Sequence, residues 1–455
     1  MGVTGHGPSS EEEDERMLSP GRTWPLLAGV IALLILAAGA CGGDDKSTTT
    51  QTPAATATAA TSVIHGDGPS GVSSPEDDRP EVGLPKGKII LGSHASLSGG
   101  FDRIPQPVDG LQTYFEYVNT EKGGVCGRQI EFQLEDDGYE PAKAQKVTRK
   151  LVEQDHIFAM VASRGTAAHS AVWEYLNENG IPDLWVMIGA HKFAADPQAH
   201  PWTVPLLPDY FVEGAIQGKY ISENFPGKKV TILYQNDDFG KDSLAGLQNA
   251  LDPSNELIAP QSYGPTAVSV QSQVASLMET GAEVAVCACI PGYTAQAIES
   301  ADRLGWEPQW IVSYVSSDQF MFSYIAPETI EGTLSLQANK LIQQTDDPAI
   351  QEHIRIMNEY ADVAPTNWTV VGQIAGELTE AALQAACDSG ILSRNSLMDA
   401  VESLRDYQSE LNLPGITWTL GPDDHTGIEA MRLLVAKVVD GKGMWEYEGD
   451  LISFR

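Results

Sequence analysis

From Lys86 onward, the sequence alternates short runs of β-branched and apolar residues with longer stretches of helical periodicity. The run KIILGSHA, for example, precedes the helical pattern VDGLQTYFEYVNTE, and QIEFQLEDD precedes PAKAQKVTRKLVEQD. Strands and helices that alternate in this way form parallel sheets with helices packed on their faces. We therefore predict an α/β fold built on mainly parallel sheets.

A second series of the same kind begins near Tyr210, where a helical pattern leads into the strand run KVTILYQ and a further helix. The segment is also too long for one ordinary hydrophobic core, which favours two lobes. Ligands of open α/β sheets bind beyond the carboxyl ends of the strands. Two facing lobes would therefore form a ligand cleft between these ends.

An apolar run, LLAGVIALLILAAGA, ends directly before Cys41. It is shorter than the about 20 residues that a membrane-spanning helix needs. It follows Arg22 and closes on small residues, which is the layout of a secretory signal peptide. The polar stretch after Cys41 is rich in Thr and Ala, which is typical of a flexible tether.

We predict that residues 1–40 form a signal peptide and that residues 41–86 form a linker. Met17 is an alternative start, because the acidic run EEEDE is unusual in a leader. In this interpretation the chain is a bacterial lipoprotein, cleaved before Cys41 and anchored outside the cytoplasm by acyl chains on that sulfur. A slightly short membrane anchor is the alternative.

The composition restricts the class of partner and of activity. The chain carries 62 acidic and 28 basic residues, a formal net charge of −34, which repels nucleic acid and anionic lipid surfaces. The sequence contains no serine-hydrolase elbow, no His-Glu-x-x-His motif and no Walker loop, and its nine histidines lack metal-ligand spacing. We therefore expect no nucleic-acid partner, no cofactor, no metal and no enzymatic activity; a lipid-anchored hydrolase is a distant alternative.

Several segments are informative because of their order, namely SLSGG (96–100), VNTEKGGVCGRQIEFQLEDDGYEP (118–141), LVEQDHIFAMVASRGT (151–166) and NGIP (179–182). Together with YQNDDFGKD and LGWEP further on, this series resembles the type I periplasmic-binding fold. It is most similar to the substrate-binding lipoproteins of branched-chain amino acid ABC transporters. The resemblance covers essentially all of the chain from Lys86 onward.

This resemblance implies two lobes, joined by three crossings, that close on a small ligand. Lobe 1 would comprise residues 87–209 and 336–413, and lobe 2 would comprise residues 210–335 and 414–455. Such proteins capture a solute, here an amino acid or a related small carboxylate, and deliver it unchanged to the permease subunits of an ABC importer. The alternative is a sensing module of the same fold that signals to a membrane receptor.

The resemblance also indicates ligand-binding residues in lobe 1. Relatives bind the ligand carboxylate with hydroxyl and backbone N–H groups where this chain has Ser163, Arg164, Gly165 and Thr166. The helix expected over residues 166–179 would offer free N–H groups to an anion, although Thr166 is alternatively a plain N-cap. Arg164 would add a bidentate contact to the carboxylate, or it would be a solvated loop charge.

Further candidates come from two loops. Gly189, Ala190 and His191 occupy positions near the ligand in relatives, with His191 in place of the usual Thr and alternatively structural. Phe101 would form an apolar wall of the site or belong to the core.

The second lobe departs most from the family pattern. Amino-acid binders of the family hold the α-ammonium with acidic groups of this lobe, whereas our alignment places Tyr210 and Tyr314 at such positions. Asp209 is adjacent to the first and would restore an acid after a shift of one residue. The tyrosines favour a small carboxylate, aromatic or otherwise apolar, at least as much as leucine, isoleucine or valine.

Four cysteines remain after Cys41, and they allow three pairings. An oxidising exterior permits a disulfide, and both Cys126 and Cys387 fall in the implied lobe 1, so we predict a bond between them. Cys287 and Cys289 lie in an apolar strand pattern. We interpret them as a buried pair of small side chains on the same side of the sheet.

Overall fold

The computed structural model describes residues 83–98 and 106–454. These described residues belong to one compact unit. Cys41, Phe101 and the predicted signal peptide lie outside the described residues. None of the helices in the described ranges is both long and apolar enough to cross a membrane.

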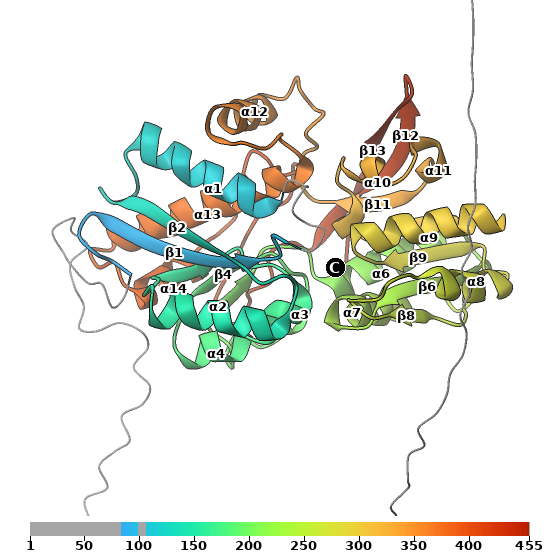
Figure 1. Cartoon of the computed structure of the whole chain (residues 1–455), viewed down its shortest axis with the longest axis horizontal. Helices are drawn as coiled ribbons and strands as arrows, with labels where there is room; N and C mark the ends of the chain where they lie inside the picture. The colour runs from blue at the N-terminus through green and yellow to red at the C-terminus, as the bar shows by residue number, and fades with distance from the viewer. Residues whose placement is uncertain (1–82, 99–105, 455) are drawn as a thin grey trace, which may run out of the picture. The chain divides into compact units, whose positions relative to one another are not determined.

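The first sheet is parallel and has the strand order β2-β1-β3-β4-β5 (Figure 1). Its strands are β1 (Lys88–Ala95), β2 (Gln129–Asp136), β3 (Ala159–Val161), β4 (Asp183–Val186) and β5 (Thr203–Pro205). The helices between them are α1 (Pro107–Tyr117), η2 (Val118–Lys122), α2 (Pro141–Glu153), α3 (Thr166–His169), α4 (Trp173–Glu178) and α5 (Lys192–Ala195). Three later helices also pack here, α12 (Pro348–Tyr360), α13 (Asn367–Asp388) and α14 (Arg394–Glu402). We call this part lobe 1.

The second sheet has the order β13-β12-β11-β10-β9-β6-β7, and β8 also pairs with β6. It contains β6 (Lys229–Gln235), β7 (Glu256–Leu257), β8 (Gln261–Tyr263), β9 (Val284–Ala288), β10 (Gln309–Val312), β11 (Leu334–Gln337), β12 (Ala430–Val439) and β13 (Lys442–Ser453). Its helices are α6 (Tyr210–Asn224), α7 (Asp238–Ala250), α8 (Gln271–Glu279), α9 (Pro291–Leu304), η3 (Tyr314–Ser316), α10 (Met321–Tyr324) and α11 (Pro327–Ile330). The pairs that join β6 to β11 are parallel, whereas β12 and β13 are antiparallel additions. We call this part lobe 2.

The central strands are nearly continuous apolar runs because helices cover both faces of the sheets. All five residues of β9 are buried, and in β1 all residues except the first and the third are buried. This burial explains why these segments read as strands in the sequence. The α/β fold with mainly parallel sheets is confirmed.

Three segments connect the two lobes. Residues 206–209 lead from β5 to α6, residues 338–347 lead from β11 to α12, and residues 403–429 lead from α14 to β12. The second and third crossings lie side by side, because the N–H of Lys340 donates to the carbonyl of Leu411.

One local expectation is wrong. The single helix expected over residues 166–179 is divided into α3 and α4, because the chain tightens where the N–H of Val172 donates to the carbonyl of His169. Cys287 and Cys289 are a buried pair, as expected, and they are also disulfide-bonded. Strand β9 ends at Ala288, so the alternation of a regular strand does not extend to the second sulfur. Cys126 and Cys387 are also bonded, which joins the turn after η2 to the last turn of α13.

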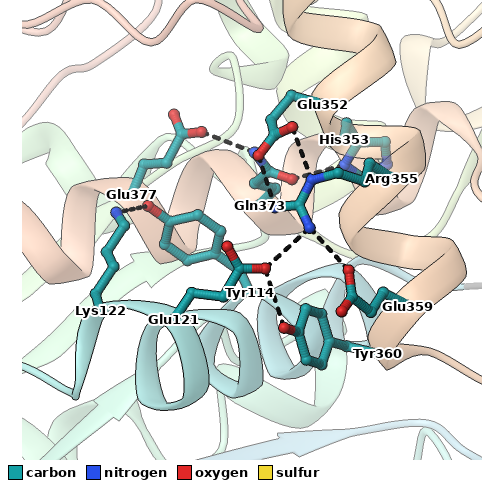
Figure 2. A network of polar contacts seen from close by, with 10 residues as sticks. All are labelled: Tyr114, Glu121, Lys122, Glu352, His353, Arg355, Glu359, Tyr360, Gln373 and Glu377. Atoms are coloured by element: carbon teal, nitrogen blue, oxygen red, sulfur yellow. Dashed lines mark hydrogen bonds and ion pairs between the residues drawn. The ribbon is translucent and has the colours of Figure 1, made fainter.

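A polar network attaches α12 to η2 (Figure 2). The guanidinium of Arg355 lies 2.9 Å from the carboxylate of Glu121 on η2 and 2.8 Å from each of its neighbours Glu352 and Glu359. The Tyr360 hydroxyl donates to Glu121 at 3.0 Å. Exposed ion pairs add little stability each, so the main effect of this network is to fix the position of α12.

Candidate functional site

A cleft lies at the junction of the two lobes. Its lining from lobe 1 consists of Ser96, Gln106, Tyr139, Arg164, Gly165, Thr166, Met187, Ile188 and Trp368, and its lining from lobe 2 and the first crossing consists of Leu207, Tyr210, Phe239, Ile290, Pro291 and Val315. Ser96, Arg164 and Met187 each follow the carboxyl end of a parallel strand. The cleft is therefore where open α/β sheets bind ligands.

Arg164 is the charged side chain of the cleft lining. Its Nη1 atom donates to Gln106 Oε1 at 3.2 Å, and its guanidinium carbon lies 5.2 Å from the centre of the Trp368 ring. Among the described residues, no carboxylate lies within ion-pair distance of it. Burial lowers the pKa of Arg164, because desolvation opposes the positive charge. The carboxylates of Asp318 and Asp137 act on this charge only from a longer distance, so an anion in the cleft would be its direct ion-pair partner.

Thr166 lies in the cleft wall and is buried. Tyr210, the first residue of α6, also lines the cleft, so lobe 1 and lobe 2 each place a side-chain hydroxyl there. Because α3 has only four residues, its dipole contributes less to anion binding than the expected longer helix would. The preceding Gly165 has φ +100°, and a Cβ atom there would lie 3.2 Å from the Tyr139 ring. Glycine is thus required at that turn.

Tyr139 connects the two lobes at the cleft. Asp137 Oδ1 accepts the N–H of Tyr139 at 2.7 Å and the Ser96 hydroxyl at 2.8 Å, which holds two pieces of the lobe 1 wall. From lobe 2, Gln235 Nε2 donates to the Tyr139 hydroxyl at 3.1 Å. The lobes are therefore in direct contact beside the ligand space.

The loop after β4 contributes fewer of the predicted residues to the cleft lining than we expected from the sequence. Met187 and Ile188 line the cleft, whereas Gly189, Ala190 and His191 do not. The side chain of His191 is 57% exposed, and its Nδ1 lies 2.7 Å from Asp209 Oδ2. This hydrogen bond raises the pKa of His191. A Cβ atom at Gly189 would lie 2.1 Å from the Pro208 carbonyl oxygen, so the glycine permits close packing at the first crossing.

Asp209 is already engaged and does not turn into the cleft. Its Oδ1 accepts the N–H groups of Phe211 and Val212 at the start of α6, and its Oδ2 contacts His191. It is the N-cap of this helix. The sequence alternative in which Asp209 holds an ammonium therefore finds no geometric support.

Tyr210 lines the cleft, but Tyr314 lies behind it, in a neighbouring cavity. The Tyr314 hydroxyl donates to the Pro208 carbonyl at 2.8 Å. Its N–H donates to Glu213 Oε1 at 2.6 Å. Burial raises the pKa of Glu213 to about 8. Ser163 is fully buried and does not line the cleft either.

None of the described residues that line the cleft is Asp or Glu. A buried ammonium without a carboxylate partner is costly, whereas Arg164 and the Thr166 hydroxyl suit a carboxylate. The rest of the wall is mostly aromatic and aliphatic. Within the described ranges, no group of His, Cys, Asp and Glu side chains has metal-binding geometry.

Sequence reasoning found Arg164, Gly165, Thr166 and Tyr210 but missed most of the apolar wall. Trp368 comes from α13, about two hundred residues after Arg164 in the sequence, and no local pattern links the two. Ser96 and Tyr139 lie in segments on which the family resemblance rests. Their positions after the strands β1 and β2 could therefore have indicated that they line the cleft.

The comparisons with known proteins agree with this architecture. A family model described as periplasmic binding protein matches residues 88–442. The Leu/Ile/Val-binding protein BraC3 of Rhizobium johnstonii is 28% identical over 158 residues, which are 34% of this chain and 41% of that protein. The matched part therefore spans less than half of that relative.

Two solved structures show the same fold. A branched-chain amino acid ABC transporter protein from Thermus thermophilus with bound valine has a TM-score of 0.70 at 18% identity, covering 80% of this chain and 96% of the other. A fatty acid ABC transporter substrate-binding protein from Thermomonospora curvata has a TM-score of 0.67 at 21% identity, covering 82% and 94%. These relatives are binding proteins, not enzymes. The chain belongs to the periplasmic binding protein family and has its type I fold.

Proposed function

We propose that this protein is an extracytoplasmic, lipid-anchored solute-binding subunit of an ABC importer, and that it captures a small carboxylate by closure of its two lobes. The observation that carries the ligand class is Arg164, a partly buried cation in the cleft that makes no ion pair within the described residues. A ligand carboxylate would accept hydrogen bonds from its guanidinium and from the Thr166 hydroxyl.

The names of two related proteins also support a carboxylate as the ligand. One solved relative holds valine and another is described as a fatty acid binder, and a carboxylate is the group that these two ligands share. The lack of acidic side chains in this cleft lining favours ligands without an ammonium group. We therefore expect simple carboxylates to bind at least as tightly as leucine, isoleucine or valine.

Calorimetric titration of the purified protein with carboxylates and amino acids tests this assignment. Arg164→Gln should weaken carboxylate binding about tenfold or more, because a hydrogen bond to a charged group contributes about 1.5–3 kcal/mol. Arg149→Gln, an exposed arginine on α2, is the matched control. Unchanged affinity in Arg164→Gln would contradict the proposal, as would recovery of a chemically altered ligand.

The anchor is tested separately. Two or more acyl chains hold a protein stably on a bilayer, whereas one binds marginally. Cys41→Ser should therefore move the protein from the membrane fraction to the soluble fraction. Retention of this variant in the membrane fraction would refute lipid anchoring and leave the ligand assignment untouched.

A further inference from the structure

A groove between the two lobes adjoins the cleft, and we call it the interlobe groove. Lobe 1 lines it mainly with Tyr139, Glu140 and Arg164, and lobe 2 lines it with residues 265–267, with the first residues of α9 and with Tyr324. Glu140 and Tyr324 are exposed, so the groove opens to solvent.

The groove and the cleft meet at four residues. Tyr139, Arg164, Ile290 and Pro291 line both spaces. A molecule that is held at Arg164 can therefore extend from the cleft into the groove.

The Arg164 side chain is available to an anion at this junction. A guanidinium has five N–H donors, and within the described residues the side chain makes one hydrogen bond, to Gln106 Oε1. Its other donors are not sealed in the protein interior, so an anion can reach them. A carboxylate is an anion that a guanidinium binds with two parallel hydrogen bonds.

The free space decides where the rest of such a molecule lies. The cleft has room for about 40 Å³, whereas the groove has room for about 410 Å³. One water molecule needs about 10–15 Å³, and an apolar cavity of about 150 Å³ holds a benzene ring. The cleft therefore accepts a carboxylate group but no hydrocarbon body, whereas the groove accepts a body of the size of two fused rings.

The lobe 2 wall of the groove is largely apolar and is held in place. The Tyr293 hydroxyl donates to the Ala267 carbonyl at 2.5 Å, and the centre of the Tyr293 ring lies 4.5 Å from that of Tyr263. Pro265 and Pro291 lie in the same wall, and proline fixes its own backbone angle φ. A wall that is already fixed loses little conformational freedom when a ligand binds. An aromatic wall also favours an aromatic ligand, because paired rings attract each other beyond the effect of their buried area.

The charges of the wall restrict the ligand further. Arg164 and Glu140 are the charged side chains among the described residues that line the groove. Glu140 is exposed, so water weakens its attraction for a cation. The rest of the wall offers no counter-ion of either sign, which favours an uncharged body on the ligand.

We propose that the interlobe groove holds the body of the ligand, and that the ligand is a monocarboxylate with a flat, uncharged body of about two rings, whose carboxylate binds Arg164. This inference rests on the proposed function, since Arg164 and the closure of the lobes belong to it. It adds the size and the shape of the ligand. A body that contacts both lobes would also stabilise their closed arrangement, because it loses one of its two walls when the lobes separate.

Calorimetry with three acids of increasing size tests the inference: propanoate, 3-phenylpropanoate and 3-(2-naphthyl)propanoate. We expect each added ring to tighten binding about five- to tenfold, because more apolar surface leaves water. The amide of the naphthyl acid lacks the charge and should bind about tenfold more weakly than the acid. Equal affinities for the three acids, or tightest binding of propanoate, would overturn the inference.

Gly292 offers a way to fill the groove. It lies in the groove wall at the start of α9, and a Cβ atom there would meet no other atom within 4 Å. Gly292→Phe should therefore keep the native melting temperature and weaken binding of the naphthyl acid about tenfold, with propanoate binding nearly unchanged. Gly421→Phe is the matched control, because a Cβ atom at Gly421 is equally free and this residue lines neither the cleft nor the groove. An equal effect of both variants on the naphthyl acid would contradict the inference.

Tyr324→Ala is a second variant whose fold is not at risk, because the Tyr324 side chain is 38% exposed. It removes part of the groove wall, so it should weaken binding of the naphthyl acid about threefold and leave propanoate binding unchanged. Unchanged affinity for the naphthyl acid in both Tyr324→Ala and Gly292→Phe would show that the ligand body lies elsewhere.

The two proposals fail differently. Equal binding of the three acids that is lost in Arg164→Gln would support the carboxylate site and refute the role of the groove. Size-dependent binding that persists in Arg164→Gln, with the amide as tight as the acid, would refute the proposed carboxylate ligand itself.

Discussion

The Nε2 atom of His94 lies 3.0 Å from the Nδ1 atom of His169, and both side chains are fully buried in lobe 1. At the outer ends of this pair, His94 Nδ1 lies 2.7 Å from Asp137 Oδ2, and His169 Nε2 lies 2.8 Å from Asp183 Oδ2. The four side chains thus form one row of three hydrogen bonds. Asp137 also holds Ser96 and Tyr139 in the cleft wall, so this row supports the ligand site.

The row restricts the tautomers of the two imidazoles. A neutral His94 ring can donate its Nδ1–H to Asp137 and accept the Nδ1–H of His169 at Nε2. Burial lowers the pKa of His94, and this effect outweighs the opposing effect of the carboxylates of Asp137 and Asp183. We predict that the His94 ring is neutral at pH 7.

Nitrogen-15 NMR of histidine-labelled protein checks this prediction. The His94 ring should show the shifts of a neutral imidazole at pH 7. His353 is the internal control, since it is buried between Gln373 and Thr369 and burial lowers its pKa to about 4. Imidazolium shifts for His94 at pH 7 would contradict the prediction.

Glu213 should make the stability of lobe 2 depend on pH. Its pKa is about 8 in the folded protein, because burial disfavours the carboxylate, against 4.5 for an ordinary glutamate. Between these values the folded state binds a proton that the unfolded state lacks. The free energy of unfolding should therefore fall as pH rises from 4.5 to 8, by at most about 1.4 kcal/mol for each pH unit.

Thermal unfolding at several pH values measures this effect. Glu213→Gln should remove this part of the pH dependence, because the amide keeps the shape but does not titrate. Glu223→Gln, an exposed position on the same helix, should leave the dependence as it is in the native protein. Parallel curves for the native protein and Glu213→Gln would show that Glu213 does not control it.

The sequence predicted the elements of this fold better than the residues of its site. The strands β1 and β6 coincide with the runs KIILGSHA and KVTILYQ, because two-sided burial imposes a local apolar pattern. The cleft, in contrast, joins residues that are distant in the sequence. Trp368 meets Arg164 through the packing of α13 in lobe 1, and no periodicity reports such a contact.

His191 illustrates a different limit of prediction from the sequence. Its alignment position indicated the ligand site, but the chain turns outward after Ile188, and Asp209 attracts the imidazole to the surface. The cavity at the hinge could not be predicted either, since Leu207, Asn339 and Asn412 in its wall come from three different crossings. Local pattern thus specifies strands and helices, whereas the site depends on long-range packing.

The disulfide between Cys126 and Cys387 should stabilise lobe 1, because it closes a loop with a sequence separation of 261 residues. Removal of a native disulfide typically costs about 2–5 kcal/mol. We predict that the double substitution Cys126→Ala and Cys387→Ala lowers the melting temperature. Peptide mapping under non-reducing conditions should recover the two cysteines in one linked peptide pair. Free thiols at both positions would refute this prediction.

Lys192 and Asp238 form an ion pair between the lobes. Lys192 on α5 follows the lobe 1 strand β4, and its Nζ lies 2.7 Å from Asp238 Oδ2 at the start of α7 in lobe 2. The Ser170 hydroxyl of lobe 1 donates to the same oxygen at 3.4 Å. These contacts exist only while the lobes are together, so they favour the closed state.

Loss of this pair should shift the protein toward an open state and weaken ligand binding. Because both side chains are partly exposed, the pair contributes about 0.2–1 kcal/mol, so Lys192→Met should raise the ligand Kd by no more than about fivefold. Small-angle scattering should show a larger radius for this variant without ligand. High salt should bring the native protein closer to the variant, because salt screens exposed charges. Lys228→Met is the control, since Lys228 pairs with Glu283 inside lobe 2. Equal radii and equal affinities for the two variants would mean that the interlobe pair does not hold the lobes closed.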